Sequence, residues 1–185
     1  MCSLAVQPSI KSAPIHPFFG HCGRPFIMTT NTARPLDATE FLIKAHQEMK
    51  QLFDEYAQLV SSNADTEDKR DAAEDICTMV TAHAMVEDEL FYPAVRQVLD
   101  DDFLLNIAEV EHEGASSLVH VIRALEPTDP LYDARVQVLA DYVIRHAERE
   151  ERELFPKIRT AGIDLGSLGV QMEARQAELL EGGVF

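Results

Sequence analysis

Four long segments of this sequence carry apolar residues at alternating intervals of three and four, the spacing of one face of an α-helix. They cover about residues 37–61, 66–92, 101–125 and 131–159. A shorter helical segment follows at about 165–180, and polar loops separate the first pair (61–65) and the last pair (126–130). Long amphipathic helices with short connections pack as antiparallel bundles. The sequence therefore predicts an all-α fold: an up-down-up-down four-helix bundle with a short fifth C-terminal helix.

Capping residues and prolines mark the ends of these segments. Asp37 and Glu40 have the spacing of a capping pair for the first helix. Pro93 is expected to kink or end the second helix, because proline has no N–H for the helical hydrogen bond. Pro156 lies near the end of the fourth helix, and Gly162 is a natural stop beyond it.

The first 35 residues differ from the rest of the chain. They contain five of the nine prolines, three basic residues and no acidic residue, and they show no helical period. We expect a disordered leader over 1–35, the bundle over 36–160, and a cap helix with a tail over 161–185. A transit peptide is the alternative for the leader, since the stretch is basic and free of acids. Met28 is a second candidate for the natural start.

Charge and cysteine content limit the partners and the compartment. The formal net charge is −16, which repels the phosphate backbone of nucleic acids and anionic membrane surfaces. No apolar run approaches the roughly 18–20 residues that span a bilayer. The three cysteines form no CxxC motif, and their odd number argues against a disulfide framework. We expect a cytoplasmic protein that binds neither nucleic acid nor membrane.

A histidine interrupts the apolar face of each of the four long helices. In two of them a glutamate follows four residues later, on the same face and about one turn away. Two helices thus offer a His/Glu pair to the bundle interior, and two offer a single histidine. The six residues are His46, His83, Glu87, His112, His146 and Glu150.

These polar residues need a strong compensating interaction inside a bundle. A buried carboxylate is destabilising by several kcal/mol unless it is paired or coordinated, and no lysine or arginine lies at the matching core positions. Metal cations satisfy both ligand types, because imidazoles supply nitrogen and carboxylates supply charge and bridging oxygens. Spacing alone leaves iron, manganese and zinc open.

The chain also repeats itself. HAMVEDELFYP (83–93) and HAEREERELFP (146–156) share the histidine, the glutamate four residues on and a proline ten residues on. His46 precedes the first motif and His112 the second at similar distances, so each half reads His…His-x-x-x-Glu. Two such halves can face each other and enclose two metal ions.

This pattern resembles the hemerythrin-like (HHE cation-binding) family over about residues 36–180. The resemblance implies a non-haem di-iron centre, with two irons per chain joined by an oxo or hydroxo bridge. It further implies that the four histidines are terminal ligands and that Glu87 and Glu150 bridge the irons.

The sequence departs from the oxygen-carrying members of that family at one position. They have a fifth histidine four residues after the third-helix histidine, where this chain has Ser116. Two six-coordinate irons need about twelve ligand sites, and about two would stay open here. We therefore expect a more open and more reactive centre. An oxidant would bind near Ser116 and Lys50, the residues four positions after the lone histidines.

Three further residues are candidates for an indirect role. Tyr142 lies one turn before His146 and could be its hydrogen-bond partner or a redox-active phenol; core packing is the alternative. Glu109 could orient the His112 imidazole; a solvated acid is the alternative. Ser116 borders the expected open position.

Three functions share this ligand set. The leading hypothesis is reaction of the centre with dioxygen or hydrogen peroxide, in defence or sensing, with catalase- or peroxidase-like turnover and an unidentified redox partner. The second is a binding module without turnover that carries dioxygen or nitric oxide or stores iron. The third is iron donation for iron–sulfur cluster repair. We expect a monomer or a weak homo-oligomer.

Overall fold

The computed structural model describes residues 34–99 and 102–183, and within them every regular element is helical. The predicted all-α class is thereby confirmed. The predicted leader, apart from residues 34 and 35, and the alternative start Met28 lie outside the described residues and stay predictions. The elements are α1 (Ala38–Ser61), α2 (Thr66–Val86), η1 (Glu87–Phe91), α3 (Tyr92–Arg96), α4 (Phe103–Ala124), α5 (Tyr132–Arg149), η2 (Glu150–Leu154), α6 (Phe155–Ile158) and α7 (Leu165–Gly182).

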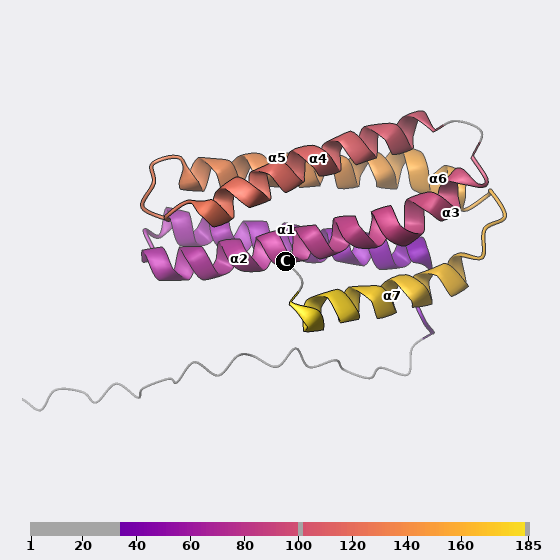
Figure 1. Ribbon diagram of the computed structural model, residues 1–185, viewed down its shortest axis with the longest axis horizontal. Helices are drawn as coiled ribbons and strands as arrows, with labels where there is room; N and C mark the ends of the chain where they lie inside the picture. Colours follow the sequence, from indigo (N-terminus) through magenta and orange to yellow (C-terminus); the bar gives the residue numbers. More distant parts are fainter. Residues whose placement is uncertain (1–33, 100–101, 184–185) are drawn as a thin grey trace, which may run out of the picture. The chain divides into compact units, whose positions relative to one another are not determined.

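Four long helices form the predicted bundle. Helix α1 packs on α2, α2 on α4, α4 on α5, and α5 back on α1, so the ring of neighbours is closed. Figure 1 shows α4 and α5 as one layer and α1 and α2 as the other. Helix α7, the predicted fifth helix, lies along α1 and α2 on the outside of the second layer. The pair α1/α2 is therefore covered by an additional helix.

Local hydrogen bonds fix the start of the bundle. The Asp37 carboxylate accepts from the Glu40 backbone N–H at 2.9 Å, and the Glu40 carboxylate accepts from the Asp37 N–H at 3.0 Å. This reciprocal pair is the predicted capping box. Gly162, the predicted stop, has a φ of 82°, in the left-handed region that glycine adopts without strain.

Both His-x-x-x-Glu helices continue through their prolines by widening one turn. The segments η1 and η2 are π-helical, and each begins at the glutamate of the motif. The Tyr92 N–H bonds to the Glu87 carbonyl five residues back, and the Phe155 N–H bonds to the Glu150 carbonyl in the same way. The wider turn accommodates the proline that follows. The expectation that Pro93 ends the helix is wrong, since the helical path runs on to Arg96.

Two apolar clusters fill the bundle, and the candidate ligands lie between them. One cluster contains Leu42, Phe91 and Phe155 together with residues of α7. The other contains Met49, Ile76 and Leu139. Along α1, for example, His46 falls between Leu42 of the first cluster and Met49 of the second. The fold thus holds a polar layer between two apolar ones.

No helix in the described ranges is long and apolar enough to cross a membrane.

Candidate metal centre

All six predicted ligands meet in the polar layer at the middle of the bundle. Helix α1 provides His46, α2 and η1 provide His83 and Glu87, α4 provides His112, and α5 and η2 provide His146 and Glu150. Five of them are at most 6% exposed, and the His112 side chain is 10% exposed. Six polar side chains are therefore removed from water in one place.

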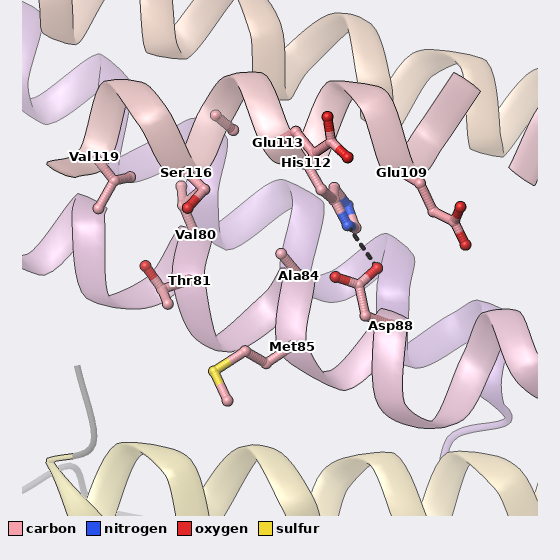
Figure 2. Close-up of a pocket in the computed structure, with 11 residues that line it drawn as sticks. Val80, Thr81, Ala84, Met85, Asp88, Glu109, His112, Glu113, Ser116 and Val119 are labelled. Carbon is pink, nitrogen blue, oxygen red and sulfur yellow. Dashed lines mark hydrogen bonds and ion pairs between the residues drawn. The ribbon is translucent and has the colours of Figure 1, made fainter. Parts of the chain in front are cut away.

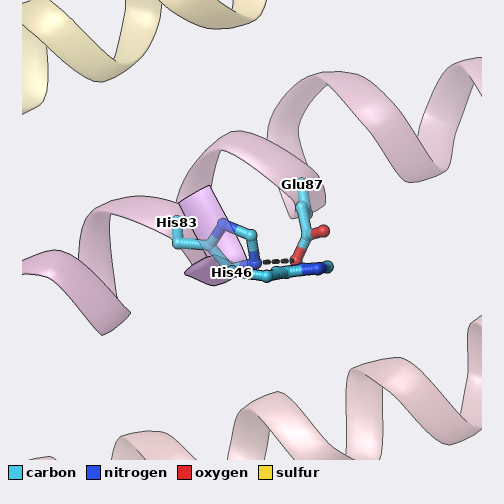
Figure 3. Close-up of side chains that lie close together, drawn as sticks. All are labelled: His46, His83 and Glu87. Carbon is cyan, nitrogen blue, oxygen red and sulfur yellow. Dashed lines mark ion pairs between the residues drawn. The ribbon is translucent and has the colours of Figure 1, made fainter. Parts of the chain in front are cut away.

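The carboxylate of Glu87 lies at the centre of this group. Its Oε2 is 3.2 Å from Nε2 of His83, 3.2 Å from Nε2 of His112 and 3.6 Å from Nε2 of His146. Figure 3 shows His83 and Glu87 side by side on one helix, with His46 beside them. Two groups of three have their ligand atoms within 4.8 Å of one another: His46, His83 and Glu87, and Glu87, His112 and His146. Glu87 belongs to both.

Glu150 borders the two groups from the opposite helix. Its Oε2 is 3.4 Å from Nε2 of His46 and 3.7 Å from Nε2 of His146. The Nε2 atoms of all four histidines thus face the two carboxylates. This arrangement offers nitrogen and oxygen donors to two adjacent cations.

Carboxylates outside the layer hold three of the imidazoles by their other nitrogen. Asp88 is 3.0 Å from Nδ1 of His112, and Glu151 is 2.9 Å from Nδ1 of His46. Glu111 is 3.2 Å from Nδ1 of His146 and also pairs with Arg149. An Nδ1–H that donates to a carboxylate leaves the Nε2 lone pair for a cation and fixes the ring orientation.

Sequence reasoning missed these three carboxylates, although two of them carried a signal. Asp88 directly follows Glu87, and Glu151 directly follows Glu150, so the acid is part of the repeated motif. Each of them contacts the lone histidine of the other half, a pairing that only the fold reveals. Glu109, predicted as the partner of His112, pairs instead with Arg96 at 2.6 Å. The orienting role is therefore not seen, and the exposed Glu109 side chain agrees with the other interpretation, a solvated acid.

One buried hydroxyl touches the carboxylates. Tyr92, 1% exposed, donates from Oη to Glu150 Oε1 at 2.9 Å and lies 3.4 Å from Glu87 Oε2. Its ring lies over His112, with centroids 5.6 Å apart, while Phe155 stacks on His46 at 6.1 Å. Sequence reasoning missed Tyr92, and the signal was the extra hydroxyl at this position of the repeat, where Tyr92 is opposite Phe155.

Tyr142 is not a core residue, since its side chain is 38% exposed. Within the described ranges no hydrogen bond joins it to the six candidate ligands. Its ring packs against Gly114 of α4, and the Arg145 guanidinium lies 5.7 Å from the ring centroid. The core-packing interpretation is wrong, and the hydrogen-bonding role is absent from this geometry.

Two open grooves reach the centre from the sides of the bundle. The larger, about 460 Å³, lies between α2 and α4 and is lined by His112, Asp88 and Ser116 (Figure 2). The smaller, about 280 Å³, lies between α1 and α5 and is lined by His46, Glu151 and Lys50. Ser116 and Lys50 therefore sit in the groove walls. Ser116 is exposed, so the position of the missing fifth histidine faces a groove.

The carboxylates set the protonation of the histidines in the metal-free protein. Burial alone would lower the pKa of His112, but the hydrogen bonds that its ring donates to Asp88 and Glu87 outweigh burial and raise that pKa to about 9. Burial opposes protonation of His146 too, yet the charge of Glu150 and the hydrogen bond that the ring donates to Glu111 raise its pKa well above the usual value. For His83, burial prevails and lowers the pKa.

The polar layer leaves several buried atoms without a hydrogen bond. In the part of the chain that the structure describes, five buried side-chain atoms make no hydrogen bond, although His46 Nε2 and His83 Nε2 lie 3.4 and 3.2 Å from carboxylate oxygens. Four of them belong to the candidate ligands: His46 Nε2, His83 Nε2, Glu87 Oε1 and Glu150 Oε2. Buried polar atoms are otherwise almost always paired. Imidazole and carboxylate atoms that converge in this way fit divalent cations.

A four-helix bundle with a buried layer of histidines and carboxylates is typical of metal-binding proteins. The chain matches the family model of the hemerythrin HHE cation binding domain over residues 37–158. It therefore belongs to that family, as the sequence resemblance indicated, and binds metal cations. A crystal structure of a hemerythrin HHE cation binding domain-containing protein from Mycobacterium kansasii has the same fold. That match has a TM-score of 0.67 and 23% identity, and covers 80% of this chain and 90% of that one.

One curated relative is similar over a shorter stretch. A protein of Nostoc sp. (strain PCC 7120 / SAG 25.82 / UTEX 2576) named DNA nickase is 36% identical over 80 residues. The match covers 43% of this chain and 22% of that protein. The matched stretch thus spans only about a fifth of the length of the relative.

Proposed function

We propose that this chain holds a non-haem di-iron centre that reacts with dioxygen or hydrogen peroxide. The observation that carries the proposal is the set of four ligand atoms in the buried layer that make no hydrogen bond. The family match supports a metal cation, the sequence resemblance implies that it is iron, and the imidazole and carboxylate donors suit iron. When bound, iron supplies the one-electron chemistry that the side chains lack.

Different residues of the chain would hold each of the two cations. His46 and His83 face one position, and His112 and His146 face the other. Glu87 lies within reach of both groups and is the first candidate for a bridge. Glu150 offers Oε2, because its Oε1 accepts the Tyr92 hydroxyl. Asp88, Glu111 and Glu151 orient the rings from outside.

The ligand count favours reaction over reversible oxygen carriage. With four histidines, two carboxylates and a bridging oxygen, about two of twelve sites remain for small molecules. Two grooves lead toward the two lone histidines and give solvent a path to the layer. A peroxide or diatomic ligand and an external electron donor are the partners that this chemistry requires.

Two other functions use the same residues. A binding module for dioxygen or nitric oxide, or an iron store, would form a stable adduct and evolve little oxygen from peroxide. Iron donation to damaged iron–sulfur clusters would require labile iron.

We do not propose that this chain nicks DNA, although the relative with the shorter match is named a DNA nickase. The net charge of −16 opposes binding to a phosphate backbone. A reducing, cytoplasmic setting fits the cysteine content.

Metal analysis of the protein purified in air without added iron tests the proposal. We expect about two irons per chain, as a pair of adjacent sites requires. Peroxide-dependent oxygen evolution then separates turnover from storage. Glu109→Gln is the matched control, since Glu109 pairs with Arg96 and is not among the six. Zinc, or no metal in a folded helical protein, would overturn the di-iron assignment.

A further inference from the structure

The two grooves that reach the candidate metal centre carry different charges. The groove between α2 and α4 is lined by three acidic residues and, within the described ranges, by no lysine or arginine. The groove between α1 and α5 is lined by two acidic and two basic residues. The acids of the first groove are Asp88, Glu109 and Glu113, and the charged pairs of the second are Glu148 with Glu151 and Lys50 with Arg152. A cation therefore meets a negative wall on one side of the bundle and a wall of mixed charge on the other.

The carboxylates of the α2/α4 groove gather at one end, around His112 (Figure 2). The opposite end is bordered by Val119, which offers a cation no ligand atom. Glu109 pairs with Arg96 at 2.6 Å, so most of its charge is neutralised. The negative charge of this end thus depends on the other two carboxylates.

Both of these carboxylates are open to a cation in the groove. Glu113 is exposed and forms no ion pair in the described part of the chain. The Asp88 side chain is 48% exposed, and its Oδ1 lies 3.0 Å from Nδ1 of His112. Its Oδ2 makes no hydrogen bond within the same residues. Asp88 thus contacts the polar layer with one oxygen and leaves the other for a cation.

His112 connects this end of the groove with the shared carboxylate. Its side chain is 10% exposed, whereas the side chains of the other three candidate histidines are at most 7% exposed. Its Nε2 is 3.2 Å from Oε2 of Glu87, which belongs to both groups of ligand atoms. A cation at His112 is therefore one contact away from the carboxylate that serves both positions.

We propose that metal cations enter the bundle through the acidic end of the α2/α4 groove, here named the entry groove and defined by Asp88, His112 and Glu113. Glu113 attracts the hydrated cation, and Asp88 binds it beside His112 while water ligands are lost. A cleft lined by one sign of charge concentrates ions of the opposite sign and speeds their association. The inference requires only that the chain binds metal cations, so it is independent of the reaction with dioxygen or peroxide.

Uptake of Co²⁺ by the metal-free protein tests this route. Co²⁺ is the probe because it binds imidazole and carboxylate donors and its visible absorption can be followed by stopped flow. We expect uptake at low salt to be about threefold slower in Glu113→Gln and about tenfold slower in Glu113→Lys, since a whole charged cleft contributes roughly 10–10³-fold. These differences should shrink as added salt screens the charges. The final amount of bound Co²⁺ should stay the same, because no hydrogen bond or ion pair joins Glu113 to the six candidate ligands in the described ranges.

Glu148→Gln is the matched control, because it removes the same charge from the α1/α5 groove. We expect its uptake rate to equal that of the unmodified protein. Both glutamates are exposed, and circular dichroism checks that each variant is folded. Equal slowing by Glu113→Gln and Glu148→Gln would show that the cation responds to the net charge of the chain, and would overturn the proposal. An unchanged rate in Glu113→Lys at low salt would overturn it as well.

Discussion

The two halves of the bundle repeat the same ligand frame in different surroundings. Each half has a lone histidine, a His-x-x-x-Glu motif, a π-helical turn and an aromatic ring that packs on the lone histidine of the other half. Three of the differences between the halves bear on the site. Tyr92 stands where the second repeat has Phe155, Glu111 precedes His112 where Ala45 precedes His46, and α7 covers α1 and α2 alone. The six candidate ligands therefore repeat almost symmetrically in the two halves, whereas the residues that contact those ligands differ between the halves.

The largest expected effect distinguishes the two glutamates. Glu87 belongs to both groups of ligand atoms, and Glu150 belongs to neither. We expect Glu87→Ala to lose nearly all bound iron, and Glu150→Ala to keep about half, because a ligand shared by two sites affects both. Metal analysis together with circular dichroism checks this. An unchanged iron content in Glu87→Ala would contradict the proposal that Glu87 is shared by both cation positions.

The next effect concerns the carboxylate that only one half has. Glu111 holds Nδ1 of His146, and no residue before His46 can do the same for His83. Loss of such an outer partner typically lowers metal affinity by about 10–100-fold. We expect Glu111→Gln to weaken one of two binding steps in a competitive titration with a chelator. Equal weakening of both steps would show that the halves act as one site.

A smaller effect should follow from the aromatic difference. Tyr92→Phe leaves Glu150 Oε1 buried without its 2.9 Å donor, which costs about 1–3 kcal/mol. We expect a lower free energy of unfolding for the metal-free variant in a urea titration. Phe155→Tyr is the matched control at the equivalent position, and Tyr92→Phe combined with Phe155→Tyr makes the comparison complete. A stability unchanged by Tyr92→Phe would mean that this hydrogen bond contributes little.

The sequence predicted what depends on helical period and on residue type. The bundle, the fifth helix and the capping box at Asp37 followed from spacing alone, and all three are present. The meeting of His46, His83 and Glu87 followed from the same argument, because residues on one face of facing helices converge in a bundle core. Their role as metal ligands remains a prediction.

What the sequence could not predict depends on contacts between helices. Asp88 reaches the histidine of another helix, a contact that the sequence analysis did not anticipate, and Glu109, a candidate to orient His112, pairs with Arg96. Tyr142 has an apolar body on the same face as His146, yet α4 offers it a glycine seat at the surface. The turn at Pro93 was missed for a different reason, since a π-helical turn has no simple sequence signature.

The last expected effect is a pH dependence with opposite signs for two histidines of the metal-free protein. The pKa of His112 is raised to about 9 by Asp88 and Glu87 against the effect of burial, so its stabilising contribution is full below pH 6.5 and fades as pH rises through 9. Burial lowers the pKa of His83, so its contribution is present above 6.5 and fades in acid. We expect His112→Asn to reduce the fall in melting temperature between pH 6.5 and 9 without removing the part due to His146 and His46, and His83→Asn to leave the fall in place. In the iron-loaded protein the melting temperature should instead rise with pH, because histidines must be deprotonated to bind a metal ion. The melting temperature is measured with a chelator present. A value that does not change between pH 6.5 and 9 would contradict a protonated His112 in the metal-free protein.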